Sequence, residues 1–300
     1  MGARLEGCSD VPHSVFSWTS TSRVWLLLVS SEGDEHPWQL QPQSLLLSGQ
    51  WGRVLPTPAA SAPQQRSQDL QREEPAAWVL GTEGDTHRGD EDKGEKGLGA
   101  VPGRQAAFRE GLALAVKYAK ALGCPRIHLM AGRVPAGTER AAMALEMEAT
   151  FIENLRYAAD ILAQEDMMGL LEPMNSRITD PRYFLTTPHQ AAAILEKVGR
   201  PNLRLQVDIF HCQIMDGNLT QNLETYFPLI GHIQVGQVPG RHEPDSPGEV
   251  NFPYLFQLLE SLGYEGYVGC EYTPQGDTLE GLGWLHAYWE SRGRQQQRRC

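Results

Sequence analysis

The sequence predicts an α/β fold built around a parallel β-sheet. From about residue 104 onward, short apolar runs alternate with amphipathic helical patterns, at about 35 residues per strand and helix. Because two parallel strands must be joined by a crossover connection, five such units in succession favour parallel strands covered by helices. The chain has 300 residues and is 41% hydrophobic, which is sufficient for a sizeable core.

The repeating pattern begins with a helix. Phe108, Leu112 and Val116 recur at helical spacing, and Gly123 is a suitable helix end, so residues 104–123 are predicted as an amphipathic helix. A short apolar run at residues 126–132 predicts a buried strand, and residues 138–164 show a long helical pattern.

Further apolar runs predict four more strands, with helical patterns between them. The strands are expected at residues 168–172, 203–209, 230–235 and 267–271, and the helices at about residues 188–198, 220–229, 252–262 and 278–289. Thr187 before Pro188 is a favourable helix start, and Gly199 and Gly263 each follow a helical pattern as its end.

The N-terminal segment, residues 1–83, has a different character. It is rich in Ser, Gly, Pro and Gln and has no sustained periodicity, so we expect it to be mostly disordered. Apolar islands at residues 24–29 and 45–47 could each form an isolated strand. The Gly-rich and charged run at residues 81–99 is typical of a linker, and residues 294–300 are interpreted as a solvated basic tail.

Charge and cysteine content exclude several classes of protein. A formal net charge of −11 and a pI near 5.3 argue against a nucleic-acid partner, which would need clustered Lys and Arg. The longest aliphatic stretch, residues 24–29, is too short to span a membrane. The 5 cysteines show no CxxC spacing, which is typical of a reducing compartment. We therefore expect a cytoplasmic protein with no membrane partner.

Polar residues close four of the predicted strands: Glu172, Asp208, Gln234 and Glu271. The carboxyl ends of parallel strands lie on one side of a sheet, so these side chains can converge. Three carboxylates and an amide oxygen suit Mg²⁺ or Mn²⁺ better than Zn²⁺. One such carboxylate alone would more often be a helix cap or a solvated loop residue, but four in successive units favour a bound divalent cation.

Other polar residues follow the same strands. Asn175 follows Glu172, His211 follows Asp208 by three residues, and Arg241 follows Gln234. His211 could equally be a core histidine, and Arg241 a solvated loop residue, but a guanidinium beside a cation is suited to a substrate carboxylate. Cys270 precedes Glu271 and would point to the opposite face of its strand, so we interpret it as a packing residue.

Several motifs together resemble the hydroxypyruvate isomerase family of the xylose-isomerase-like TIM-barrel superfamily. They are Glu172-Pro-Met-Asn, Asp208-Ile-Phe-His, Gln234-Val-Gly-Gln-Val-Pro-Gly-Arg, Cys270-Glu-Tyr, Gly97-Leu-Gly-Ala-Val-Pro-Gly-Arg and Arg126-Ile-His-Leu-Met-Ala-Gly. The resemblance covers residues 84–293 and implies a (βα)8 TIM barrel.

The resemblance also implies a reaction and its residues. The reaction is interconversion of hydroxypyruvate and 2-hydroxy-3-oxopropanoate (tartronate semialdehyde). Glu172, Asp208, Gln234 and Glu271 would hold the divalent cation. Glu172 and Glu271 would also donate and accept the proton, while His211 and Arg241 would bind substrate. Two carboxylates suffice to move a proton between adjacent carbons through an enediolate.

The chain departs from the complete barrel at its N-terminus. Barrel units four to eight are present, whereas units one to three are not recognisable in residues 1–83. We therefore expect an incomplete barrel with two unpaired sheet edges and an open apolar interior.

Three alternatives to an active isomerase stay open. A catalytically impaired partial barrel could act as a binding or association module, with a homo-oligomer formed through its sheet edges. A sugar epimerase would share the cation site but usually has His where this chain has Gln234. An apurinic-site endonuclease would need more zinc-binding His and a basic groove.

Overall fold

The structure, a computed structural model, describes residues 23–30, 38–40, 46–48, 79–80, 95–278 and 280–297. Its strands are β1 (Arg23–Ser30), β2 (Trp38–Leu40), β3 (Leu46–Ser48), β4 (Val79–Leu80), β5 (Arg126–His128), β6 (Met168–Leu171), β7 (Leu203–Asp208), β8 (Ile230–Val235) and β9 (Val268–Tyr272). In the described residues they form a nine-stranded sheet in the order β2-β1-β9-β8-β7-β6-β5-β4, with β3 paired to β1.

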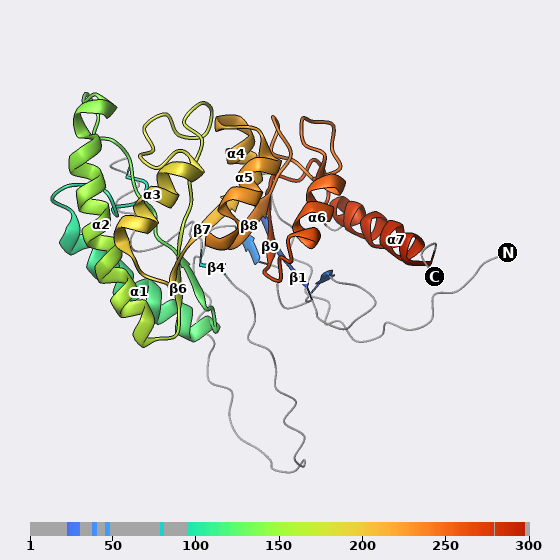
Figure 1. Cartoon of the computed structure of the whole chain (residues 1–300), viewed down its shortest axis with the longest axis horizontal. Helices are drawn as coiled ribbons and strands as arrows, with labels where there is room; N and C mark the ends of the chain where they lie inside the picture. The colour runs from blue at the N-terminus through green and yellow to red at the C-terminus, as the bar shows by residue number, and fades with distance from the viewer. Residues whose placement is uncertain are drawn as a thin grey trace, which may run out of the picture.

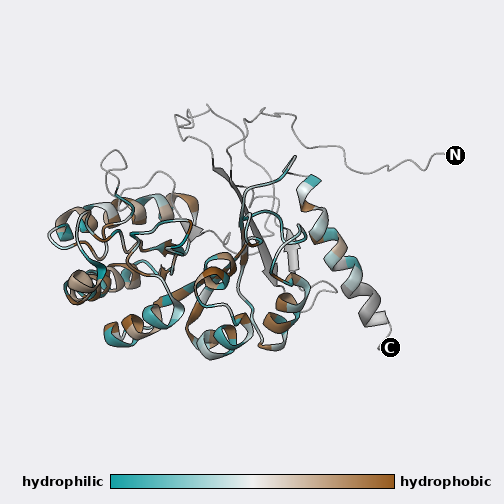
Figure 2. Ribbon diagram, turned by 90° about the horizontal axis from the view of Figure 1, so that it is seen from above, coloured by the Kyte–Doolittle hydropathy of each residue, from teal (hydrophilic) through white to brown (hydrophobic). Residues whose placement is uncertain are grey.

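Strands β4 to β9 run parallel, which confirms the predicted α/β alternation. The helices are α1 (Gln105–Leu122), α2 (Arg140–Gln164), α3 (Pro188–Val198), α4 (Ile209–Met215), α5 (Leu219–Tyr226), α6 (Phe252–Ser261) and α7 (Gly283–Gln297), with short 3-10 helices η3 (Phe227–Leu229) and η4 (Glu280–Leu282). They follow one another along the sheet, from α1 and α2 at one end to α6 and α7 at the other (Figure 1). Seen from above, they form an arc along the strands (Figure 2).

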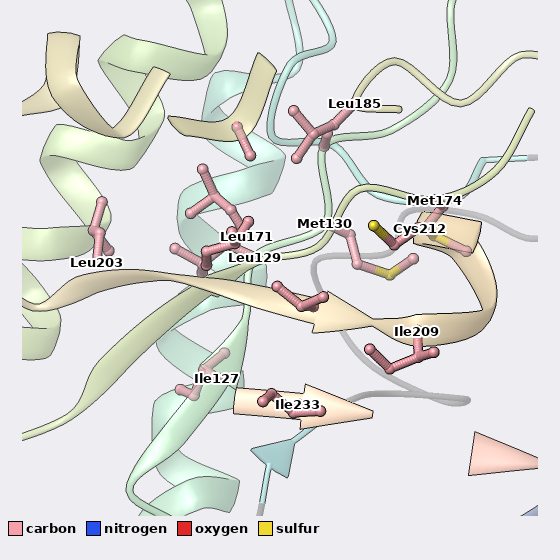
Figure 3. Packing of buried hydrophobic residues seen from close by; sticks show 14 of the residues in the cluster. Ile127, Leu129, Met130, Leu171, Met174, Leu185, Leu203, Ile209, Cys212 and Ile233 are labelled. Atoms are coloured by element: carbon pink, nitrogen blue, oxygen red, sulfur yellow. The ribbon is translucent and has the colours of Figure 1, made fainter. Parts of the chain in front are cut away.

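The two faces of the parallel strands differ in polarity. Leu203, Leu205 and Val207 of β7 point into the hydrophobic core. Figure 3 shows Ile127, Leu171 and Leu203, from three different strands, among the residues of this core. The alternate positions of β5, β7 and β8 carry buried polar side chains, among them His128, Gln206 and His232. The expected apolar interior is therefore only partly observed, because alternation places these polar residues on the same face as Leu170 of β6.

The helix ends agree with their predicted signals. The Thr187 hydroxyl accepts a hydrogen bond from the backbone N–H of Gln190, Pro188 occupies the first turn of α3, and Gly199 ends the helix with φ 66°. Helix α4 was not predicted. It begins directly after β7, where Asp208 Oδ1 accepts from the backbone N–H of Phe210 at 2.8 Å, and its 7 residues are too few to show a helical period.

The sheet edges differ from the expectation. Both apolar islands of the N-terminal segment overlap strands, since residues 24–29 lie in β1 and residues 46–47 lie in β3. These strands are not isolated: β1 pairs with β9 in antiparallel direction and with β3. At the other end, β4 pairs with β5. The outer edges of the five predicted strands are therefore covered, because pairing satisfies backbone groups that an open edge would expose.

The remaining predictions for the chain ends are only partly within the described residues. Most of residues 1–83 lie outside them. The predicted last helix, residues 278–289, corresponds to η4 and α7, and α7 extends to Gln297, so most of the expected tail is helical. Among the described helices, none combines the length and the apolar character needed to cross a membrane.

Candidate functional site

The four predicted strand-end residues lie on neighbouring strands of one sheet. Glu172 directly follows β6, Asp208 ends β7, Gln234 lies near the end of β8, and Glu271 lies near the end of β9. Asp208 and Gln234 are register partners. All four side chains are buried, with 0–7% of each residue exposed. Parallel pairing therefore brings them to the same end of the sheet, as their spacing predicted.

Arg241 connects two of these residues. Its Nη2 atom lies 2.6 Å from Asp208 Oδ2 and 3.0 Å from Glu271 Oε2. Its Nε atom donates to the backbone carbonyl of Glu271 at 3.2 Å, and its guanidinium lies 4.8 Å from the ring centroid of Phe210. Because one nitrogen contacts both carboxylates, Asp208 and Glu271 belong to the same buried cluster of charged groups. Arg241 is thus a buried residue of the site rather than a solvated loop residue.

Glu172 lies on the other side of Asp208. Glu172, Asp208 and His211 each offer an atom that could bind a metal ion, all within 4.8 Å of one another. His211 Nε2 is 3.6 Å from Asp208 Oδ2 and 3.8 Å from Glu172 Oε1. His128 Nδ1 is 3.3 Å from Glu172 Oε2. The carboxylate of Glu172 is therefore flanked by two histidine rings.

Burial and charge act strongly on Glu172. Burial raises the pKa of Glu172 well above its usual range, and the nearby carboxylates of Glu271 and Asp208 raise it further. Arg241 and Lys96 lower this pKa but do not reverse the shift. The protein without a cation therefore favours Glu172 in its protonated form, because the site already holds negative charge in a medium that solvates it poorly.

The opposite balance holds for Arg241. Burial alone would lower the pKa of Arg241, but the carboxylates of Glu271, Asp208 and Glu172 raise it overall. The guanidinium therefore stays charged and supplies positive charge to the site.

Gln234 forms an amide pair with Gln206, which lies two residues before Asp208 on β7. Gln206 Nε2 donates to Gln234 Oε1 at 2.7 Å, and Gln206 Oε1 and Gln234 Nε2 have no hydrogen-bond partner in the structure. Turning both amides reverses the direction of this bond, since each amide is both donor and acceptor. Gln234 would then present its oxygen where its Nε2 now lies.

The side chains present fit a divalent cation. Glu172 Oε1, like the two amide atoms just described, is buried and has no hydrogen-bond partner in the structure. Three buried carboxylates and an amide form a hard oxygen donor set, which suits ions that prefer oxygen ligands. Such a cation would also offset the charge that makes ionised Glu172 costly.

Some residues of the site were not singled out from the sequence. His128 ends β5 and contacts Glu172, Gln206 lies two residues before Asp208 on β7, and Lys96 acts electrostatically on Glu172 from the segment before α1. A signal existed for Gln206, because it occupies the same face of β7 as Asp208. Cys270, by contrast, lies in the hydrophobic core as predicted, and burial raises its pKa above the usual range of a thiol.

Comparison with known proteins agrees with this fold. A family model described as xylose isomerase-like TIM barrel matches residues 57–288. The human "Putative hydroxypyruvate isomerase" is 73% identical over 208 residues, which cover 69% of this chain and 75% of that protein. The 2-oxo-tetronate isomerase of Cupriavidus necator is 46% identical over 200 residues, covering 67% of this chain and 75% of that protein.

A solved structure extends the comparison. The crystal structure of an AP endonuclease, family 2, from Brucella melitensis is 45% identical, with a TM-score of 0.62 over 67% of this chain and 75% of that one. Together with the extent of the family match, these identities establish the relationship. The chain belongs to the xylose isomerase-like TIM barrel family and, within it, to the hydroxypyruvate isomerase family.

Proposed function

We propose that this chain is a divalent-cation-dependent isomerase that interconverts hydroxypyruvate and 2-hydroxy-3-oxopropanoate. The observation that carries the proposal is the convergence of Glu172, Asp208, Gln234 and Glu271, all buried, at the ends of four neighbouring strands. The names of the relatives support an isomerase, and the site offers the two proton-carrying groups that such a reaction requires.

Two carboxyl groups would move the proton. The reaction takes a proton from C3 of hydroxypyruvate and returns one to C2, while the oxygen on C3 loses its proton and the oxygen on C2 gains one. Glu271 is proposed to accept the carbon-bound proton and Glu172 to donate one. Both carboxyl groups are buried at the same end of the sheet, which supports their assignment as the pair that transfers the proton.

The cation would be held by the four strand-end residues. When bound, it would polarise the substrate carbonyl and stabilise the negative charge that develops on the substrate oxygens. A hard ion such as Mg²⁺ or Mn²⁺ is proposed rather than Zn²⁺, since the predicted ligand set consists of three carboxylates and an amide and contains no thiolate and no imidazole.

Arg241 and His211 are proposed to bind the substrate. A guanidinium has five N–H donors, so Arg241 can keep a contact to Asp208 or Glu271 and still bind the substrate carboxylate. His211 lies between Glu172 and Asp208 and is placed for a substrate oxygen.

The test is turnover of hydroxypyruvate by the purified full chain, with and without Mn²⁺. Glu172→Gln and Glu271→Gln each keep the size of the side chain and remove its ability to exchange a proton. Loss of a general acid or base lowers the rate by roughly 100-fold or more, so we expect a decrease of that size in kcat. Glu224→Gln, in an exposed position on α5, is the matched control and should keep full activity. Wild-type activity equal to that of either site variant would contradict the proposal.

A second substrate is favoured by a specific observation. One relative at 46% identity is named a 2-oxo-tetronate isomerase. That compound, like hydroxypyruvate, is a 2-oxo acid with a hydroxyl on the neighbouring carbon, so the same residues could act on it. The ratio of kcat/KM for the two substrates, measured on one preparation, decides which the site prefers.

A further inference from the structure

The orientation of the Asn175 amide is determined by the backbone that follows it. Asn175 Oδ1 accepts hydrogen bonds from the backbone N–H groups of Ile178 and Thr179, both at 3.0 Å. The side chain is fully buried. Since an amide nitrogen cannot accept a hydrogen bond, these two donors fix which end of the Asn175 amide is oxygen.

The other end of the amide contacts His211. Asn175 Nδ2 lies 2.7 Å from His211 Nδ1 and 2.8 Å from Thr179 Oγ1. An NH2 group can only donate, so His211 Nδ1 must be the acceptor. The imidazole ring then carries its single hydrogen on Nε2, because a nitrogen that accepts a hydrogen bond has no hydrogen of its own.

This tautomer matters because of where Nε2 lies. His211 Nε2 faces Asp208 and Glu172, at 3.6 Å and 3.8 Å from their carboxylate oxygens. Spacing alone would allow His211 to join these two residues around a metal ion. A protonated Nε2, however, has no lone pair to give a cation, and it can only act as a hydrogen-bond donor there.

We propose that Asn175 is a positioning residue that keeps His211 as an Nε2–H donor to a substrate oxygen and outside the ligand set of the cation. The substrate contact rests on the proposed isomerase function. The enediolate of that reaction carries negative charge on oxygen, and a neutral imidazole N–H fixed beside it stabilises this charge without the ring having to change its protonation.

The tautomer can be measured without substrate, by ¹⁵N NMR of protein labelled at histidine, with His211→Gln identifying the His211 signals. The decisive variant is Asn175→Asp. One of its carboxylate oxygens can still accept from Ile178 and Thr179, but the other would face His211 Nδ1 and require a hydrogen on that atom. We expect the wild type to show hydrogen on Nε2 alone, and Asn175→Asp to show it on Nδ1. Thr179→Val removes only the second acceptor of the Asn175 amide and should leave the His211 signals unchanged.

Kinetics provide the second measurement. Loss of a donor to a developing oxyanion lowers kcat by roughly 100-fold, with a smaller effect on KM, so Asn175→Asp should show that pattern and Thr179→Val should not. Hydrogen on Nδ1 in the wild type, or an unchanged spectrum in Asn175→Asp, overturns the proposal. A wild type with hydrogen on Nε2 but no turnover of hydroxypyruvate would overturn the proposed function and the substrate contact, and would leave the role of Asn175 toward His211 in place.

Discussion

At the scale of single residues, Arg241 supplies positive charge to two of the carboxylates that are predicted to bind a cation. Its Nη2 atom contacts one oxygen of Asp208 and one of Glu271. The second oxygen of Asp208 already accepts from the backbone N–H of Phe210. A cation bound by Asp208 or Glu271 would therefore lie close to the guanidinium, and two positive groups so close repel each other.

Replacing Arg241 should thus have opposite effects on stability and on cation binding. In EDTA, Arg241→Met leaves buried carboxylates without their partner, and breaking a buried ion pair costs roughly 3–5 kcal/mol of unfolding free energy. The affinity for Mn²⁺ should rise several-fold, because the competing charge is gone. Urea denaturation measures the first effect and calorimetric titration with Mn²⁺ the second.

A surface pair gives the control for Arg241. Arg200 lies 3.0 Å from Asp160 with both side chains largely exposed, so Arg200→Met should change stability by no more than about 1 kcal/mol and leave Mn²⁺ binding unaffected. Weaker Mn²⁺ binding in Arg241→Met would mean that the guanidinium orients the ligands rather than competing for them.

His232 gives a residue-scale prediction about pH. Burial lowers the pKa of His232 from 6.5 to about 3, with further lowering by Arg126 and His128. The folded protein therefore keeps this ring neutral where the unfolded chain protonates it. Its contribution to stability is complete above about pH 6.5 and is lost as the pH falls toward about 3, with a slope that approaches roughly 1.4 kcal/mol per pH unit.

The variant His232→Gln tests this slope, because glutamine does not titrate. Urea denaturation of the metal-free protein between pH 7 and pH 4 should show a shallower loss of stability in the variant than in the wild type. His189→Gln, whose side chain is 68% exposed, serves as the control. Equal slopes for His232→Gln and the wild type would show that the ring is not held neutral.

At the scale of elements, the segment before α1 is held against the end of β5 by its backbone. Gly97 bridges Ala131, Gly99 N–H donates to Met130 O at 3.0 Å, and Ala100 N–H donates to Ala131 O at 2.6 Å. Gly97 has φ +94°, and a Cβ there would lie 2.5 Å from Met130 Cβ. This close contact places Lys96, the next residue toward the N-terminus, where its charge acts on Glu172.

Gly97→Ala should therefore be more costly than an alanine at an open glycine. Gly103 also has a positive φ, +78°, but a Cβ there would meet nothing within 4 Å. Gly103→Ala measures the backbone effect alone, roughly 1–2 kcal/mol, and Gly97→Ala adds the steric clash, roughly 1–3 kcal/mol more. Thermal unfolding of the two variants checks the difference, and equal losses would show that the segment can move away from Met130.

The elements also show which parts of the fold can be predicted from sequence. The observed bounds of α3 and β8 match the predicted ones. Capping residues mark both ends of α3, and the apolar run that predicts β8 covers the whole strand. Glu172, Asp208 and Glu271 could be predicted to meet, since parallel strands place their ends together. Strand alternation could have placed Gln206 on the face of Asp208, but its contact with Gln234 depends on how β7 pairs with β8. The tautomer of His211 depends on a contact with Asn175, on another unit of the barrel, and no sequence pattern encodes it.

At the scale of the whole molecule, the sequence predicts least well which strand pairs with β9, and in which direction. A complete barrel would pair its last strand with a parallel first strand. Here β1 pairs with β9 in the antiparallel direction, with Trp25 opposite Glu271 and Leu26 opposite Cys270. The apolar island at residues 24–29 contains no information about its partner, because strand pairing over such a sequence distance is decided by the assembled sheet.

Because β1 pairs with β9, we predict that disrupting β1 weakens cation binding, since β9 carries Glu271. Successive N–H groups of a strand point in opposite directions, so Leu26→Pro combined with Leu27→Pro must remove a hydrogen-bond donor that faces β9. We expect faster hydrogen exchange at residues 268–272 and weaker Mn²⁺ binding, since Glu271 lies on that strand. Gln39→Pro, in β2, interrupts only the pairing of β2 with β1 and should leave both measurements close to the wild type. Unchanged exchange at residues 268–272 in the double proline variant would show that β9 does not depend on β1 for its order, and that the cation site is complete within the parallel strands alone.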